Sequence, residues 1–250
     1  MNDSLSDLPE GEIHLWVASP EDWAAPSQIA SARHTLDGTE IARLERFRFP
    51  AHRHLFLVSH LLVRTALSRY ADLPPDAWRF IHDRFGKPHI DPAMGAAPLT
   101  FSLAHTASLA VVGVARQHRI GVDVEKADRP VNGAALSRRF FSRVEADALE
   151  DLPPGRRAKR FPLYWTLKEA YIKALGPGLS HPLDSSAFHL TGTDPYRIDF
   201  STTDRQDHGT WRFALIEPRP SYVAALCAHA AGHETFAVRC HQALATGESA

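Results

Sequence analysis

Two apolar stretches of similar length and character constrain the fold of this chain more than any other feature. Residues 108–115 read SLAVVGVA and residues 221–228 read SYVAALCA, and each pattern is typical of a buried β-strand. Each stretch lies late in its half of the 250-residue chain. The sequence therefore predicts an internal duplication of an α/β unit of about 110 residues.

The rest of the chain supplies helices and further strands to both expected halves. Apolar residues recur at helical intervals in 38–50, 52–70, 134–141, 159–175 and a segment that starts at residue 142. Other strands are expected at 12–18, 78–81, 101–103, 120–125, 187–190, 211–215 and 235–238. We therefore expect a mixed α/β (α+β) fold, with an N-terminal half at residues 1–118 and a C-terminal half at residues 119–250.

Charge and composition exclude several classes of partner. A net charge of −1 and a pI near 7.0 give no general attraction to nucleic acid or to an anionic membrane. No apolar run approaches the roughly 20 residues of a membrane span, and the acidic first residues do not resemble a signal peptide. Cys227 and Cys240 are too few for a disulfide framework or a cysteine-based zinc site. We expect a cytoplasmic globular protein.

Two acidic residues share one side of an expected strand. Because side chains alternate along a strand, Asp123 and Glu125 point the same way within 120–125. Neighbouring carboxylates repel each other unless a cation lies between them, and such hard oxygen donors suit Mg²⁺ better than Zn²⁺. Glu145 is a third candidate ligand, although the Ser142-x-x-Glu145 spacing is also that of a helix capping box.

An acid and a base lie one turn apart in the expected helix 159–175. Trp165, Glu169 and Lys173 are spaced by four residues and fall on one helix face. Taken alone, Glu169 and Lys173 are better explained as an ordinary ion pair on a solvated face, which contributes roughly 0.3–0.5 kcal/mol. Trp165 is more typical of a core residue than of one that contacts substrate.

Six short blocks, taken in order, resemble the surfactin-type 4′-phosphopantetheinyl transferases. The blocks are FGKP at 85–88, FSLAHT at 101–106, IGVDVEK at 120–126, RFFSRVE at 139–145, WTLKEAYIK at 165–173 and GPGLS at 176–180. The resemblance extends from about residue 40 to residue 190 and includes the signature blocks of that family.

This resemblance implies both a fold and a reaction. The fold is a pseudo-dimer of two similar α/β halves in one chain, monomeric, with the site between the halves. The reaction is the Mg²⁺-dependent transfer of 4′-phosphopantetheine from coenzyme A to a serine of an apo acyl or peptidyl carrier protein, which releases adenosine 3′,5′-bisphosphate. A metal ion and lysines suit the charge that develops on the pyrophosphate oxygens.

The resemblance also implies roles for the acidic and basic residues of the second half. Asp123, Glu125 and Glu145 match the Mg²⁺ ligands. Glu169 matches the candidate general base for the serine hydroxyl, which acts directly or through a metal-bound water. Lys173 and a further lysine, Lys168, match positions that contact the pyrophosphate.

Coenzyme A contacts are implied in the first half. His105 matches a residue that contacts a phosphate of coenzyme A, and Lys87 lies in the glycine-lysine-proline turn that binds it. Arg43 and Arg53 match the basic positions that serve the nucleotide 3′-phosphate.

Two departures from the family pattern affect coenzyme A binding. Ala104 stands where the family usually has serine, so a hydroxyl contact is missing unless Ser102 or Thr106 supplies it. Glu40 aligns with a lysine that contacts the 3′-phosphate, which makes that part of the site the least defined.

Two other functions use the same residues. A metal-dependent hydrolase of nucleotide pyrophosphates would need the same acidic cluster, and it would cleave coenzyme A without an acceptor. A non-catalytic module that binds coenzyme A or a carrier protein would show no turnover.

Overall fold

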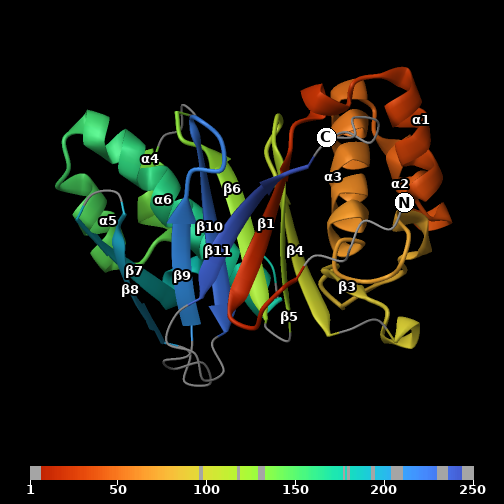
Figure 1. Cartoon of the computed structure of the whole chain (residues 1–250). Coiled ribbons are helices and arrows are strands. Elements are labelled where there is room, and N and C mark those ends of the chain that lie inside the picture. The colour runs from red at the N-terminus through yellow and green to blue at the C-terminus, as the bar shows by residue number, and fades with distance from the viewer. Residues whose placement is uncertain are drawn as a thin grey trace. The chain divides into compact units, whose positions relative to one another are not determined.

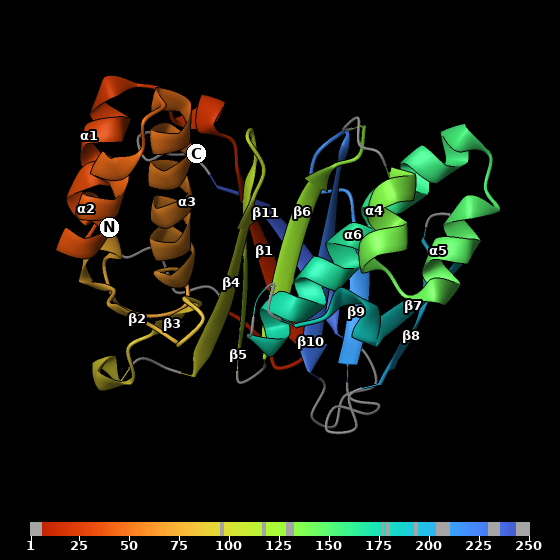
Figure 2. The same ribbon diagram turned by 180° about the vertical axis from the view of Figure 1, so that it is seen from behind.

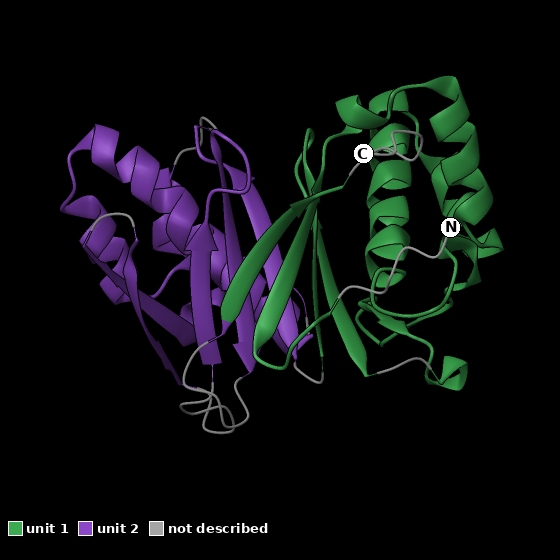
Figure 3. Cartoon of the chain, in the orientation of Figure 1, with its two compact units in different colours: residues 1–117, 237–250 green, residues 118–236 purple. Residues whose placement is uncertain are grey.

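The computed structural model describes residues 7–95, 98–116, 119–128, 133–176, 178, 181–192, 195–203, 211–229 and 236–243. The chain divides into two compact units, in which residues 1–117 with 237–250 form unit 1 and residues 118–236 form unit 2 (Figure 3). The mixed α/β class expected from the sequence is confirmed. The units differ from the expected halves in the segment 237–250, because strand β11 (Ala237–Gln242) pairs in parallel with β1 (Glu12–Ala18).

Unit 1 is built on a four-stranded sheet in the order β11-β1-β5-β4. Strands β4 (Leu99–His105) and β5 (Ala110–Arg116) are antiparallel, and β5 is also antiparallel to β1. The connection from β1 to β4 contains the helices α1 (Pro26–Thr35), α2 (Gly38–Arg46) and α3 (Pro50–Leu67) and the hairpin β2–β3 (Phe80–His82 and Pro88–Ile90). Figure 1 shows α3 alongside the sheet, with α1 and α2 farther from it.

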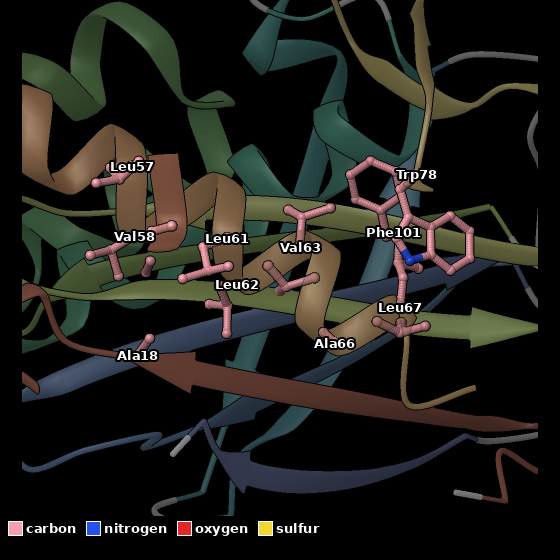
Figure 4. Close-up of a cluster of buried hydrophobic side chains, with 14 of the residues drawn as sticks. Ala18, Leu57, Val58, Leu61, Leu62, Val63, Ala66, Leu67, Trp78 and Phe101 are labelled. Carbon is pink, nitrogen blue, oxygen red and sulfur yellow. The ribbon is translucent and has the colours of Figure 1, made fainter. Parts of the chain in front are cut away.

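The core of unit 1 lies between α3 and the sheet. Helix α3 begins with Pro50 at its first position, where the missing N–H costs no hydrogen bond. Its apolar side chains, such as Leu61 and Leu62, are almost fully buried, and Figure 4 shows them gathered with Phe101 of β4 and Trp78. Burial of each leucine stabilises the unit by roughly 1.5–3 kcal/mol. The packing of α3 against the strands is therefore a major source of the stability of unit 1.

Unit 2 has a three-stranded antiparallel sheet in the order β6-β10-β9. Its strands are β6 (Ile120–Lys126), β9 (Trp211–Ile216) and β10 (Tyr222–His229). Its helices are α4 (Gly133–Phe140), α5 (Arg143–Glu150) and α6 (Pro154–Leu175), and they precede the hairpin β7–β8 (Ser186–Thr191 and Arg197–Thr202). Figure 2 shows α6 lying across one face of the sheet.

Both units follow one plan. In each, a first strand leads through helices to one long helix, and a two-stranded hairpin and two antiparallel strands follow. The sheet orders β1-β5-β4 and β6-β10-β9 correspond strand for strand. Strands β5 and β10 carry most of the two similar apolar stretches and lie at the same place in the two sheets. The expected pair of similar halves is therefore confirmed.

Proline explains the main local differences from the expected elements. Helix α1 begins at Pro26, where a turn was expected, and α6 begins at Pro154 instead of residue 159. Proline suits the first position of a helix, because that residue needs no N–H partner. Leu179 and Ser180, which end the last block of the family pattern, lie outside the described residues. No described helix is long and apolar enough to cross a membrane.

Candidate active site

Helix α6 approaches β6 so closely that one strand position requires glycine. A Cβ atom at Gly121 would lie 1.9 Å from the carbonyl oxygen of Ala170 and 2.5 Å from the backbone nitrogen of Ala174. Because side chains alternate along β6, Asp123 and Glu125 share the strand face that Gly121 presents to α6. The close approach thus brings the acidic end of β6 next to the helix. The sequence signal for it is a glycine inside a buried strand, which often marks close backbone approach.

Lys173 of α6 forms an ion pair with Asp123 of β6. The Nζ atom of Lys173 donates a hydrogen bond to Oδ1 of Asp123 at 2.7 Å. Asp123 is 7% exposed, and burial raises the pKa of its carboxyl group, although attraction to Lys173 opposes the shift. Oδ2 of Asp123 is buried and accepts no hydrogen bond from the described residues. A buried carboxylate oxygen without a donor is a favourable place for a cation.

Glu169 belongs to the same cluster. Burial raises the pKa of Glu169, and the negative charge of Asp123 raises it further. Glu125 acts in the same direction, whereas the ammonium group of Lys173 lowers the pKa of Glu169. The carboxyl groups of Asp123, Glu125 and Glu169 therefore lie close enough to affect one another, and Lys173 attracts both Asp123 and Glu169.

Glu145 and Lys168 form a second, buried pair. Both side chains are 0% exposed, and Oε2 of Glu145 lies 2.7 Å from Nζ of Lys168. Glu145 also accepts hydrogen bonds from the backbone nitrogen and hydroxyl of Ser142, at 2.9 and 2.7 Å, and from the backbone nitrogen of Phe188 at 2.9 Å. The expected capping box is confirmed. Burial lowers the pKa of Lys168, and attraction to Glu145 offsets part of the shift.

The donor chemistry around Asp123 suits a hard divalent cation. As the side chains stand, no three His, Cys, Asp or Glu residues of the described ranges are placed so that they could hold a metal ion. Carboxylate oxygens are nevertheless the protein ligands that Mg²⁺ prefers, and Asp123 offers a buried oxygen that lacks a donor within the described chain. The carboxyl group of Glu169 interacts electrostatically with Asp123 and Glu125, whereas both oxygens of Glu145 already have partners.

Lys168 and Lys173, predicted to contact the pyrophosphate of coenzyme A, lie in unit 2, and the other residues predicted to bind coenzyme A lie in unit 1. Lys87 ends the turn between β2 and β3, where its backbone nitrogen donates to Oδ1 of Asp83 at 3.0 Å. The same oxygen accepts from the backbone nitrogen of Phe85 at 2.8 Å. Gly86 adopts a φ of 86°, a left-handed conformation that favours glycine. The turn is therefore held by backbone hydrogen bonds to the Asp83 carboxylate.

His105 is the last residue of β4 and is exposed. Ala104, which departs from the family pattern, is 3% exposed. The hydroxyl of Thr106 accepts hydrogen bonds from the backbone nitrogens of Ser108 and Leu109 at 3.2 and 3.1 Å, and Ser102 is 4% exposed. Replacement of the missing serine contact by Ser102 or Thr106 stays a prediction.

Arg43 and Arg53 are exposed at α2 and the start of α3. The guanidinium carbon of Arg43 lies 5.5 Å from the centre of the Phe56 ring, and Arg53 donates to the carbonyl oxygen of Phe47 at 2.9 Å. Arg43 also lines a pocket of about 150 Å³ whose walls include Phe80.

The family models that match this chain cover most of it. Residues 119–227 match the model of the 4′-phosphopantetheinyl transferase superfamily. Residues 16–117 match a model described as 4′-phosphopantetheinyl transferase, N-terminal. The boundary between the two matches lies next to the boundary between the two compact units.

Curated relatives give the same result over longer alignments. The chain is 32% identical to the 4′-phosphopantetheinyl transferase HetI of Nostoc over 222 residues, which covers 88% of each chain. It is 30% identical to the 4′-phosphopantetheinyl transferase Sfp of Bacillus subtilis over 186 residues, or 74% of this chain and 79% of that one. A mouse L-aminoadipate-semialdehyde dehydrogenase-phosphopantetheinyl transferase is 22% identical over 223 residues, or 84% of this chain and 72% of that one.

Proposed function

The chain belongs to the 4′-phosphopantetheinyl transferase superfamily, and we propose that it transfers 4′-phosphopantetheine from coenzyme A to a serine of an apo acyl or peptidyl carrier protein with the help of Mg²⁺. The observation that carries this proposal is the buried acidic face of β6, where Asp123 meets Lys173 of α6. Anionic oxygen donors beside a lysine suit a metal ion and a pyrophosphate substrate together.

Asp123, Glu125 and Glu169 would hold the metal ion. Burial raises the pKa values of Asp123 and Glu169, and the negative charges of Asp123 and Glu125 raise the pKa of Glu169 further, so a divalent cation would relieve an excess of negative charge. Glu145, the third ligand expected from the family pattern, is fully buried against Lys168 and Ser142, and we therefore propose Glu169 in its place. When bound, Mg²⁺ supplies charge neutralisation on the pyrophosphate oxygens.

Two side chains of α6 would bind the substrate and accept the proton. Lys173 is 31% exposed, so its ammonium group can bind a pyrophosphate oxygen while it stays close to Asp123. The serine oxygen forms a bond to the phosphorus that carries pantetheine, and the bond from that phosphorus to adenosine 3′,5′-bisphosphate breaks. Glu169 is also the proposed acceptor of the serine proton, because a carboxylate beside the reacting groups can act as a general base.

Residues of unit 1 would bind coenzyme A. Arg43, Arg53, Lys87 and His105 are the proposed contacts, and their side chains offer positive charge for the phosphates of the nucleotide. Glu40 and His60 line the same pocket as Arg43. The protein would act as a monomer, since the duplicated plan is complete within one chain.

Incubation with coenzyme A, Mg²⁺ and a panel of apo carrier proteins tests this function. Mass spectrometry should show a gain of one phosphopantetheine group on at least one carrier, and the panel also identifies the preferred carrier. No mass gain on any carrier would contradict the proposal. Release of nucleotide without a carrier would instead support a pyrophosphate hydrolase, and binding without turnover would support a binding module.

A further inference from the structure

Lys168 has no free hydrogen-bond donor with which to bind a phosphate. Its side chain is 0% exposed. An ammonium group has three N–H donors, and the Nζ atom has three acceptors: Oε2 of Glu145 at 2.7 Å and the carbonyl oxygens of Leu183 and Ser186 at 2.8 and 2.6 Å. All three donors are therefore engaged inside the protein. This arrangement conflicts with the pyrophosphate contact that the family pattern implies for Lys168.

The partners of Lys168 come from separate elements. Glu145 lies in the first turn of α5, while Leu183 begins a 3₁₀ turn, Leu183–Ser185, and Ser186 follows that turn. The ring of Phe188 in β7 lies 5.8 Å from Nζ of Lys168. Lys168 thus ties α6 to α5 and to the start of the β7–β8 hairpin.

Unit 1 contains the same arrangement. Glu40 is the third residue of α2 in a capping box with Asp37, as Glu145 is of α5 with Ser142. Glu40 forms an ion pair with Arg64 of the long helix α3, and Arg64 is 0% exposed. The guanidinium carbon of Arg64 lies 5.0 Å from the centre of the Phe80 ring of β2. A carboxylate at a helix start and a buried cation on the long helix therefore occur in both units.

The carbonyl partners correspond as well. Arg64 donates to the carbonyl oxygens of Pro75 at 3.3 Å and Trp78 at 2.8 Å. Pro75 begins the 3₁₀ turn Pro75–Ala77, and Trp78 follows it. These are the same two places that Leu183 and Ser186 take in unit 2. The duplicated fold has kept this buried connection on both sides, so it belongs to the scaffold of each unit.

The proposed chemistry is not duplicated. When residues 108–115 are aligned with 221–228, Val112 corresponds to Ala225, and their partners Trp16 and Asp123 then correspond on the first strands. In unit 1 the guanidinium carbon of Arg69 lies 6.0 Å from the centre of the Trp16 ring. At the corresponding place in unit 2, Lys173 donates a hydrogen bond to Asp123. Unit 1 therefore has the indole ring of Trp16 at the position where unit 2 has the carboxylate of Asp123.

The long helices differ in the same way. If Arg64 is aligned with Lys168, Thr65 corresponds to Glu169 and Arg69 to Lys173. Unit 1 thus lacks a counterpart of the Glu169 carboxylate at that position, although it keeps the buried pair. Residues that serve the reaction differ between the units, while residues that serve the scaffold agree.

We propose that Lys168 is a positioning residue that does not touch coenzyme A, and that its pair with Glu145 holds α6 so that Glu169 and Lys173 face Asp123. This inference rests on the proposed transferase function. Neighbouring helix residues project in different directions, so Lys168 can anchor one side of α6 while Glu169 serves the other. The counterpart Glu40–Arg64 fixes α3 in unit 1 in the same manner.

A double-mutant cycle on the pair tests the inference. The variants are Lys168→Met, Glu145→Gln and their double variant. Lys173→Met, alone and combined with Glu145→Gln, serves for comparison. Removal of one partner leaves an uncompensated buried charge, whereas removal of both does not. We expect Lys168→Met to lower kcat by about 100-fold through misplacement of Glu169. The double variant should recover at least roughly tenfold of that loss, with a KM for coenzyme A within about twofold of wild type.

Three results would overturn the inference. If Lys168→Met and the double variant are equally impaired and the KM for coenzyme A rises in both, Lys168 contacts the substrate. If both single variants, assayed at a temperature at which circular dichroism shows them folded, keep the wild-type kcat, the pair has no role in positioning. If Glu145→Gln rescues Lys173→Met as well as Lys168→Met, the coupling is not specific to the pair.

Stability measurements keep the test decisive. Each single variant should lower Tm by more than about 6 °C, and the double variant should lower it by less than the two single effects combined. Additive losses would contradict the pair itself. If Lys168→Met does not fold, the double variant is compared with wild type directly. A kcat within about tenfold of wild type supports the inference, and a larger loss contradicts it. A wild-type protein that modifies no carrier would refute the proposed function, whereas a failed cycle in an active enzyme refutes this inference alone.

Discussion

The ammonium group of Lys173 lies 2.7 Å from Oδ1 of Asp123, which joins helix α6 to strand β6 at the acidic face of unit 2. Asp123 is almost fully buried, while the Lys173 side chain is 31% exposed. The pair therefore has one member fixed in the protein and one that can reach a ligand. This difference separates the proposed role of Lys173 from that of Lys168, which is 0% exposed.

Replacement of Lys173 by methionine should reduce kcat/KM for coenzyme A by roughly 100-fold, because a charged donor to the pyrophosphate is lost. Steady-state kinetics with a modified carrier as product would measure the effect. Lys126→Met is a matched control, since Lys126 also lies in unit 2 but is 50% exposed and pairs with Asp128 at 3.6 Å. Equal losses in the two variants would contradict a specific role for Lys173.

Replacement of Glu169 by glutamine tests its place in the metal site. A ligand role predicts that the Mg²⁺ concentration for half-maximal activity rises by tenfold or more. Titration of activity with Mg²⁺ at saturating coenzyme A would measure the change. A lower kcat with an unchanged Mg²⁺ dependence would remove Glu169 from the metal site and leave it the role of general base.

Replacement of Gly121 by alanine should destabilise unit 2 and abolish most of the activity. The added Cβ would lie 1.9 Å from the carbonyl oxygen of Ala170, so α6 must move, and overpacking of this kind costs about 1–3 kcal/mol or more. Gly155→Ala is the control, because a Cβ at Gly155 of the same helix meets nothing within 4 Å. Thermal unfolding followed by circular dichroism should distinguish the two variants, and equal Tm values would contradict the packing argument.

A low pH should reduce the contribution of the Glu40–Arg64 ion pair to the stability of unit 1. Burial raises the pKa of Glu40, but hydrogen bonding and attraction from His60, with attraction from Arg64, outweigh it and lower the pKa from 4.5 to about 2. The folded state therefore binds a proton less readily than the unfolded state. The stability from this group is fully present above pH 4.5 and is lost as the pH falls toward 2, by about 2 kcal/mol after allowance for solvent screening.

Urea unfolding of wild type and Glu40→Gln at several pH values would measure this effect. The difference between the two midpoints should narrow as the pH falls below 4.5. Glu45→Gln in the same helix is the control, because Glu45 is 61% exposed and its pair with Arg33 should contribute less than about 1 kcal/mol. A difference that does not change with pH would contradict the assigned shift.

The duplicated fold and the acidic face could be predicted from the sequence. The two apolar stretches lie at the same place in the two sheets, and alternation along β6 places Asp123 and Glu125 on the same strand face. These patterns depend on local periodicity, which one sequence contains. Strand β8 has no counterpart among the expected strands, although Ile198 and Phe200 alternate with polar residues along it.

The separation of Lys168 from Glu169 could not be predicted from their spacing. Lys168 and Glu169 are adjacent charged residues of one helix, and their order in the sequence does not show which of them is buried. Only the tertiary packing around α6 shows that it is Lys168. The sequence does contain one signal for the role of Glu145. The spacings Asp37-x-x-Glu40 and Ser142-x-x-Glu145 repeat a capping box in both halves. The repetition indicates that Glu145 serves the scaffold.

Quantification of both products tests the central claim most directly. The protein would be incubated with coenzyme A, Mg²⁺ and an apo carrier, and with a carrier whose acceptor serine is replaced by alanine. The account predicts one adenosine 3′,5′-bisphosphate released for each phosphopantetheine gained by the carrier, and neither product with the altered carrier. It also predicts that Asp123→Asn, which keeps the shape of the side chain but removes its charge, forms neither product. Nucleotide release without carrier modification, or wild-type yields from Asp123→Asn, would contradict the account.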